Sequence, residues 1–160
     1  MTIRQAAQDD WKSIQNLNRQ IFDYEINIEP SSNLEFPYTP EAVSYFRKAC
    51  EGLDNHIAFV CEKDGAVVGY AIAKLIPAQD LTHRVGIRLA QVHTLGVDKA
   101  YRRMGIGRQL IATCRDWAVG NGANRLKIVA YAGNEVARSL YSSMDFHEFE
   151  VGYEMDIAKK

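Results

Sequence analysis

One short stretch, residues 95–108, constrains the fold of this 160-residue chain more than any other. A hydrophobic strand pattern ends at Val97, a basic loop follows, and a helical pattern begins around Gly105 and Gly107. The first N–H groups of a helix have no partner within the helix, and its aligned peptide dipoles add about half a positive charge there. Glycine lets a ligand approach the backbone closely. The stretch therefore predicts a strand–loop–helix unit that binds an anion such as a pyrophosphate.

Two familiar phosphate-binding motifs do not describe this stretch. A Walker A loop is excluded because the pattern G-x-x-x-x-G-K-[ST] is not present. A dinucleotide fingerprint would need a third glycine at position 110, where the chain has Leu110. The plain structural alternative is a glycine-containing turn with solvated arginines.

The rest of the sequence predicts an α+β domain in the order β-α-α-β-β-β-α-β-α-β-β. Asp64-Gly65 predicts a hairpin turn, and Thr39-Pro40-Glu41 predicts a helix start. Because no repeat or Gly/Ser linker divides the chain, we expect one domain over residues 1–160. Strands are expected at residues 2–4, 56–61, 66–75, 87–97, 126–131, 146–149 and 153–157, and helices near residues 9 and 40 and at residues 105–119 and 134–144.

Composition and charge narrow the class of protein. The composition, 47% hydrophobic and 24% charged, is typical of a globular domain. A formal net charge of -1 argues against a nucleic-acid partner, which requires a basic surface. No apolar run approaches the roughly 20 residues that span a bilayer, so no membrane partner is expected. With no signal-peptide pattern and three scattered cysteines, we expect a cytoplasmic protein, and the four histidines lack metal-ligand spacing, so we predict no metal.

Two motifs give the chain a family resemblance. The pattern R-x-x-G-x-G at residues 102–107 matches the [RQ]-x-x-G-x-[GA] signature of the GNAT superfamily of N-acetyltransferases. The pattern N-x-x-A-x-x-x-Y-x-x-x-D-F at residues 134–146 resembles a second element of that family, which usually has glycine where this chain has Asp145. Aspartate tolerates the left-handed conformation better than most residues, so the departure is compatible with the family. The element order resembles the family across residues 2–157.

The resemblance implies a single GNAT-type domain with four helices and a mixed central sheet that splays apart between its fourth and fifth strands. Acetyl-CoA would enter that gap as the acyl donor. Backbone amides of residues 103–108 would hold its pyrophosphate, the backbone of Leu95 and Val97 would pair with the pantetheine arm, and the Asn134 side chain would contact that arm. The implied cofactor-binding residues are Leu95, Gly96, Val97, Arg102, Arg103, Met104, Gly105, Ile106, Gly107, Arg108, Asn134 and Arg138.

The resemblance also indicates the catalytic residues. Tyr141 matches the family's general acid, whose phenol would protonate the leaving sulfur; the alternative is a tyrosine that only packs on the core. Many members carry a glutamate base where this chain has Gln91, which cannot act as a base. His93 lies two residues further, on the same strand face, and a neutral imidazole suits that role. A structural His93, with water as the proton acceptor, stays open.

Carboxylates and aromatic rings gather between the first two expected helices, at residues 22–38, where the family usually meets its acceptor together with the loop at residues 77–84. Such side chains attract and hold a cation, although a solvated acidic loop would look the same. The principal hypothesis is acetyl transfer to a primary amine of a small, cationic molecule. Alternatives are a protein N-terminal or lysine acetyltransferase and a non-catalytic CoA-binding regulatory module. A homodimer is compatible with all of these.

Overall fold

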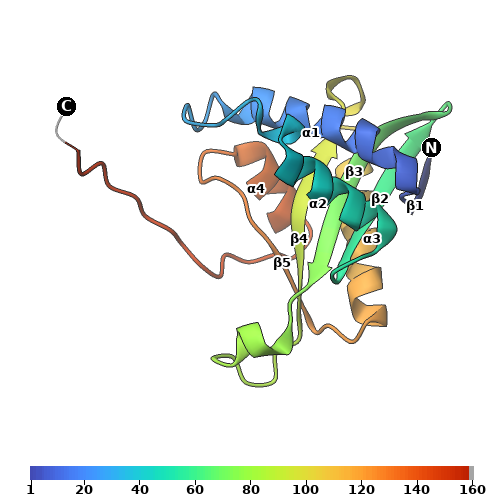
Figure 1. The fold of residues 1–160 in the computed structure, drawn as a ribbon. Coiled ribbons are helices and arrows are strands. Elements are labelled where there is room, and N and C mark those ends of the chain that lie inside the picture. Colours follow the sequence, from blue (N-terminus) through green and yellow to red (C-terminus); the bar gives the residue numbers. More distant parts are fainter. Residues whose placement is uncertain (159–160) are drawn as a thin grey trace.

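A five-stranded mixed sheet in the order β1-β2-β3-β4-β5 forms the centre of the protein (Figure 1). This computed structural model describes residues 1–158. Neighbouring strands from β1 to β4 run antiparallel, and β5 runs parallel to β4. The predicted hairpin turn between β2 and β3 is confirmed, with positive φ angles of 52° at Asp64 and 78° at Gly65. The strands are β1 (Thr2–Gln5), β2 (His56–Lys63), β3 (Ala66–Leu75), β4 (Leu89–Val97) and β5 (Arg125–Ile128).

Helices cover both faces of this sheet. One buried cluster joins α1 and α2 to the sheet, with Phe46 and Ile72 among its members. A second cluster on the opposite face joins α3 to the sheet, with Val92 and Leu110 among its members. The single α+β domain with four helices that the sequence predicts is confirmed. The helices are α1 (Trp11–Glu25), α2 (Pro40–Glu51), α3 (Ile106–Gly120) and α4 (Glu135–Ser142).

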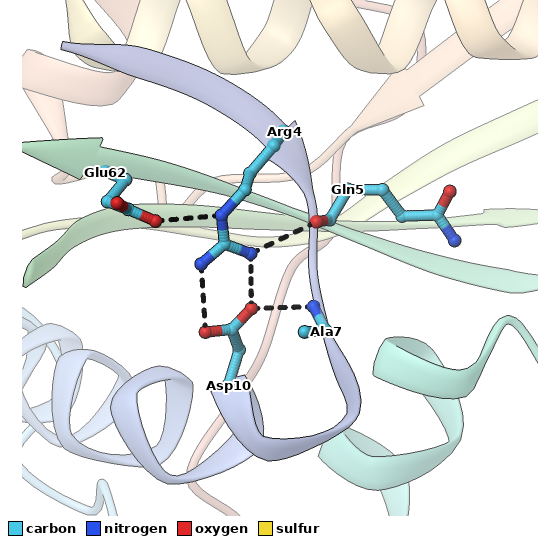
Figure 2. Close-up of polar contacts among 5 residues, drawn as sticks. All are labelled: Arg4, Gln5, Ala7, Asp10 and Glu62. Carbon is cyan, nitrogen blue, oxygen red and sulfur yellow. Dashed lines mark hydrogen bonds and ion pairs between the residues drawn. The ribbon is translucent and has the colours of Figure 1, made fainter. Parts of the chain in front are cut away.

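Polar contacts fix the start of both helices on the first face. The predicted start of α2 is confirmed, because the Thr39 hydroxyl accepts a hydrogen bond from the Ala42 N–H at 3.2 Å. At the start of α1, the Arg4 guanidinium donates to Asp10 at 2.6 Å and to Glu62 at 2.9 Å (Figure 2). These bonds connect the first strand, the entry to α1 and β2.

The sheet opens between β4 and β5. The two strands pair over only four positions, from Leu89 opposite Arg125 to Val92 opposite Ile128. Beyond Val92, β4 continues to Val97 beside β3 but has no β5 residue opposite it. The predicted splay between the fourth and fifth strands is therefore confirmed, and one edge of β4 has no strand partner within residues 1–158 along residues 93–97.

Some predicted element boundaries are wrong. Strand β5 ends at Ile128 rather than near residue 131, and β4 begins at Leu89 rather than at residue 87. The two strands expected at residues 146–149 and 153–157 are not formed. Alternating apolar and polar residues favour an extended backbone, but a strand also needs hydrogen bonds from a neighbouring backbone, and here no such ladder forms.

Candidate active site

The loop after β4 is held in place from α1. Gln20 donates to the Asp98 carboxylate at 2.9 Å and accepts from the Lys99 N–H at 3.0 Å. The second Asp98 oxygen accepts from the Ala100 N–H at 2.8 Å, which caps a short 3₁₀ turn (Lys99–Tyr101). The loop that leads into α3 therefore has a fixed course before any ligand binds.

Left-handed residues turn the chain from this loop into α3. Gly105 is the residue before the helix and has φ 80°, and Arg103 has φ 65°. A Cβ at Gly105 would meet no atom within 4 Å, so the space beside this helix start is open. Arg103 and Met104 are exposed there. An open, positively polarised helix N-terminus is the geometry that the sequence predicts for an anion site.

Gly107, the second glycine of the motif, has a different surrounding. A Cβ at Gly107 would lie 3.3 Å from Leu140 Cδ2 and 3.9 Å from Leu95 Cδ2. Gly107 thus lets α4 and β4 approach the first turn of α3. Arg108 donates to the Ser143 hydroxyl at 2.7 Å, which fastens the same turn to the end of α4.

The other implied cofactor residues divide into backbone and side-chain candidates. Ile106 is buried in the core, so only its backbone can meet a ligand. Gly96 packs against the Tyr70 ring, where a Cβ would lie 2.6 Å from Tyr70 Cε1. Arg102 donates to the Val97 carbonyl at 3.1 Å. Ile106, Gly96 and Arg102 therefore stabilise the fold around the candidate site in addition to any contact with a ligand.

Two candidates lie on α4. Asn134 caps this helix, because its Oδ1 accepts from the Ala137 N–H at 3.1 Å, so only its Nδ2 amide is left to donate to a ligand. Arg138 donates to the Ala132 carbonyl at 3.1 Å and forms an ion pair with Glu148 at 2.6 Å. Asp145, directly after α4, has φ 64°, which confirms the predicted left-handed geometry.

Tyr141 also lies on α4, and its surroundings keep the phenol protonated. Burial raises the pKa of Tyr141 to about 12, and the negative charge of Glu25 adds to the effect. Glu25 is the last residue of α1, and burial in turn raises the pKa of its carboxyl group. A phenol that stays protonated at neutral pH can act as a proton donor. In the sequence, Glu25 belongs to an acidic segment and nothing marks its effect on Tyr141, because that effect depends on where the fold places the end of α1 relative to α4.

His93 occupies an irregularity in β4. On β3, Ile72 pairs with Thr94. The next residue, Ala73, pairs with Val92, so His93 is the extra residue of a β-bulge. A bulge interrupts the regular alternation of side chains along a strand. The direction of the His93 imidazole therefore does not follow from alternation along β4.

A ring cluster surrounds His93. The Tyr45 ring stacks on it at 6.3 Å between centroids, and the His56 ring meets it edge-on at 5.9 Å. Although His93 reaches solvent, this packing partly desolvates the imidazole and lowers its pKa, and the positive charges of His56 and Lys74 lower it further. His93 is therefore neutral at pH 7 and able to accept a proton. Tyr45 and His56 lie far from His93 in the sequence, and no local motif marked them.

The acidic segment after α1 is partly neutralised. Arg19 forms ion pairs with Asp23 at 2.9 Å and with Glu35 at 3.2 Å. Glu29 accepts from the Ser31 hydroxyl at 2.6 Å. The half-buried Glu25 makes neither an ion pair nor a side-chain hydrogen bond among residues 1–158, so it differs from Asp23, Glu29 and Glu35.

A membrane-spanning helix or a cluster of metal ligands would indicate other functions. No helix within residues 1–158 has the length and apolar character that crossing a membrane requires. In the same residues, no three His, Cys, Asp or Glu side chains come together as metal ligands.

Comparison with known proteins identifies the family. The chain matches the Acetyltransferase (GNAT) family over residues 11–146, a range that includes both motifs and the splayed strands. The chain belongs to this family. The prediction of a GNAT N-acetyltransferase fold is thereby confirmed.

Curated relatives of this GNAT chain are distant and longer. The N-alpha-acetyltransferase RimI of Mycobacterium tuberculosis is 33% identical over 111 residues, which are 69% of this chain and 61% of that protein. An uncharacterized protein of Mycobacterium leprae is 45% identical over 56 residues, 35% of this chain and 15% of that protein. The chain thus spans less than two thirds of either relative.

Solved structures share the fold over nearly the whole chain. A mutant of the BH1408 protein from Bacillus halodurans has a TM-score of 0.86 at 20% identity, covering 99% of this chain and 100% of that one. The aminoglycoside acetyltransferase AAC(6')-Iy, in complex with a bisubstrate analog, has a TM-score of 0.73 at 17% identity, with 98% of each chain covered. At these identities the likeness supports the fold alone.

Proposed function

We propose that this GNAT protein transfers an acetyl group from acetyl-CoA to a primary amine of a small, cationic acceptor by direct attack in a ternary complex. The observation that carries the proposal is the opening of the sheet after Val92, where the unpaired edge of β4 adjoins the N-terminus of α3. Leu140 of α4 and Leu95 of β4 both lie against Gly107, so the helix that carries Tyr141 borders the same region.

Each part of this region has a proposed role toward acetyl-CoA. The amides around Gly105 would bind the pyrophosphate, because they point from an open helix start. The edge of β4 along residues 93–97 would pair with the amides of the pantetheine arm, as an added strand does. Asn134 Nδ2 would donate to the same arm, while Oδ1 keeps its capping bond.

The proposed chemistry has two proton steps. An alkylamine has a pKa of about 10.4, so presenting it as the neutral nucleophile at pH 7 costs about 4.6 kcal/mol. The amine nitrogen attacks the thioester carbonyl carbon, loses a proton toward His93, and the C–S bond breaks as the amide forms. Tyr141 donates its proton to the departing sulfur, so that CoA leaves as the thiol. The lowered pKa of His93 and the raised pKa of Tyr141 support this division of roles.

Glu25 is the carboxylate that would attract the proposed cationic acceptor. Its carboxylate is half-buried, and its charge acts on Tyr141. A cationic acceptor bound there would place an amine between the acidic end of α1 and the acetyl group. Because Asp23 and Glu35 already share Arg19, Glu25 is the carboxylate that supports the preference most directly.

A second candidate function is acetylation of a protein N-terminus, and the resemblance to RimI supports it. The two functions differ in the acceptor, not in the acyl donor. We further propose a cytoplasmic location, which the three buried, unpaired cysteines support.

A thiol-release assay with acetyl-CoA tests both functions. The acceptors are polyamines, amino sugars, amino acids and short peptides with free N-termini, and Tyr141→Phe is the background control. Faster turnover of a small cationic amine than of any peptide supports the proposal, and the reverse order favours a protein acceptor. Binding of acetyl-CoA without turnover of any acceptor would instead favour the non-catalytic module.

A further inference from the structure

Helix α1 is attached to the β4 side of the opening between β4 and β5. Gln20 binds the loop between β4 and α3 through the Asp98 carboxylate and the Lys99 N–H. The next residue of α1, Ile21, lies against β4 itself, because a Cβ at Gly96 would be 3.1 Å from Ile21 Cδ1. These contacts fix the second half of α1 on β4 and on the loop that follows it.

Tyr24 makes a further contact with the same loop. The Arg102 guanidinium carbon lies over the Tyr24 ring, 5.7 Å from its centroid. Arg102 also donates to the Val97 carbonyl at 3.1 Å, so two contacts hold the first residue of the R-x-x-G-x-G motif. Because a cation is attracted to the face of an aromatic ring, the Tyr24 ring restricts the directions that the Arg102 side chain can take.

Ile28 contacts the other side of the opening. It lies in the turn after α1, where its N–H donates to the Glu25 carbonyl at 2.8 Å. A Cβ at Gly133 would be 3.0 Å from Ile28 Cγ2. Gly133 directly precedes Asn134, which caps α4 and is a proposed ligand of the pantetheine arm. A side chain at position 133 would therefore press on Ile28 and displace the turn between β5 and α4.

These contacts of α1 have a regular spacing. Gln20, Tyr24 and Ile28 stand four residues apart, which places them on one side of a helix and of the turn that continues it. The first two meet the β4 side of the opening, and the third meets the β5 side. The second half of α1 and the turn after it therefore connect the two sides of the opened sheet (Figure 1).

We propose that Tyr24 and Ile28 are positioning residues for acetyl-CoA, because they set the distance between the two sides of the opening. This inference rests on the proposed binding of acetyl-CoA in that opening. Tyr24 acts through Arg102 on the pyrophosphate side, and Ile28 acts through Gly133 on Asn134 at the pantetheine arm. An opening of fixed width spares the ligand the entropic cost of ordering both sides when it binds.

Calorimetry with CoA tests the role of Ile28 without using turnover. Gly133→Val adds three carbon atoms at the contact and should weaken CoA binding by about 10-fold, within the range of coupling between residues in contact. Ile28→Ala removes three carbon atoms from the other side of the same contact. The combined variant should therefore bind CoA more tightly than Gly133→Val alone. Gly120→Ala, where a Cβ meets no atom within 4 Å, is the control and should bind CoA as the unchanged protein does.

The outcomes of this experiment are separable. Thermal unfolding of each variant shows which of them fold. A folded Gly133→Val variant with unchanged CoA affinity, or a combined variant as weak as Gly133→Val, overturns the role of Ile28. Ile28→Ala by itself loosens the contact and should also weaken CoA binding. Unchanged CoA affinity in Ile28→Ala would contradict the proposal even if Gly133→Val did not fold.

A double-mutant cycle tests Tyr24. Tyr24→Leu should weaken CoA binding by about 2- to 5-fold, the effect of losing an exposed cation–π contact, whereas Tyr24→Phe keeps a ring and should bind CoA normally. When Arg102→Gln is present, Tyr24→Leu should have no further effect. Tyr38→Leu, at another exposed tyrosine of the segment after α1, is the control. Equal losses in Tyr24→Phe and Tyr24→Leu, or a loss that persists without Arg102, would mean that Tyr24 does not act through the guanidinium.

Failure of this inference and failure of the proposed function give different results. A protein that binds CoA but acetylates no amine lacks the proposed function, while the CoA affinities of the variants still decide the roles of Tyr24 and Ile28. Acetyl transfer by the unchanged protein, together with variants that all bind CoA equally well, overturns this inference alone. An unchanged protein that does not bind CoA overturns both.

Discussion

Gly107 and Leu140 bring helices α3 and α4 together, since a Cβ at position 107 would lie 3.3 Å from Leu140 Cδ2. The glycine of the phosphate-loop motif therefore sets the distance of α4 from the helix start that is proposed to bind pyrophosphate. Gly105, by contrast, faces open space and has φ 80°. The two glycines of one motif thus serve two different needs: Gly105 forms the turn, and Gly107 permits packing.

The first prediction separates these needs. Gly107→Val should push Leu140 away, destabilise the protein by about 1–3 kcal/mol as overpacking does, and lower acetyl-CoA affinity. Adding Leu140→Ala to Gly107→Val should restore part of the lost stability and part of the lost acetyl-CoA affinity. Thermal unfolding and calorimetry measure the two effects. Gly120→Ala, where a Cβ meets no atom within 4 Å, is the control and should change neither. Equal losses with and without Leu140→Ala would contradict the packing role.

The second prediction concerns the proton donor. Tyr141→Phe keeps the ring and removes the hydroxyl, so kcat should fall by about 10²- to 10⁴-fold with little change in acetyl-CoA affinity. Because the pKa of Tyr141 is raised to about 12, the phenol should stay an acid throughout the neutral range. Tyr131→Phe, which alters an exposed tyrosine before α4, is the control. Turnover by Tyr141→Phe equal to that of the unchanged enzyme, with chemistry rate-limiting, would leave the acid unassigned.

The third prediction concerns the base. If neutral His93 accepts the proton, kcat/KM should rise with pH through a midpoint below the ordinary histidine value, because burial, His56 and Lys74 all lower its pKa. His93→Gln should remove that limb. Lys74→Met removes a positive charge, eases protonation of His93, and should move the midpoint to higher pH. A profile that neither substitution changes would return His93 to a structural role.

The fourth prediction tests the acceptor site. Glu25→Gln removes the half-buried carboxylate near Tyr141 and should raise KM for a cationic acceptor, with a smaller effect on the KM for acetyl-CoA. Glu29→Gln is the matched control, because Glu29 is satisfied by Ser31. Initial-rate kinetics with both substrates varied measure the difference. The acceptor preference is wrong if the KM for the acceptor changes equally in the two variants.

The fifth prediction concerns the contacts in Figure 2. Burial opposes ionisation of Asp10, but bonds from Arg4 and the Ala7 N–H outweigh it and hold the pKa of Asp10 below its usual value. A depressed carboxyl pKa stabilises the fold above the unfolded-state pKa, and the contribution is lost as pH falls through the folded-state pKa. Asp10→Asn should therefore cost about 2 kcal/mol of unfolding free energy at pH 7 and progressively less below about pH 4.

Urea unfolding at several pH values measures this difference. Asp9→Asn, at the exposed neighbouring position, is the control and should cost little at any pH. A constant cost of Asp10→Asn from pH 7 to pH 3 would mean that its charge does not contribute.

Local sequence determined much of this protein. Asp64-Gly65 makes the hairpin turn and Thr39 caps α2, because these depend on backbone preferences of adjacent residues. The motifs at residues 102–107 and 134–146 together indicated the family, because each of them lies within one short stretch of the chain. Asp145 adopts the left-handed conformation that its place after α4 requires.

Only the tertiary structure decided which distant side chains meet. Tyr45 and His56 surround His93 because α2, β2 and the bulge in β4 pack together, and Glu25 acts on Tyr141 through the approach of α1 to α4. Residues 149–157 illustrate the converse: their alternation of apolar and polar side chains favours an extended backbone, but a strand also needs the backbone of a neighbouring strand. The sequence of one segment specifies its own torsion angles, whereas pairing and pKa values depend on the neighbours that the fold supplies.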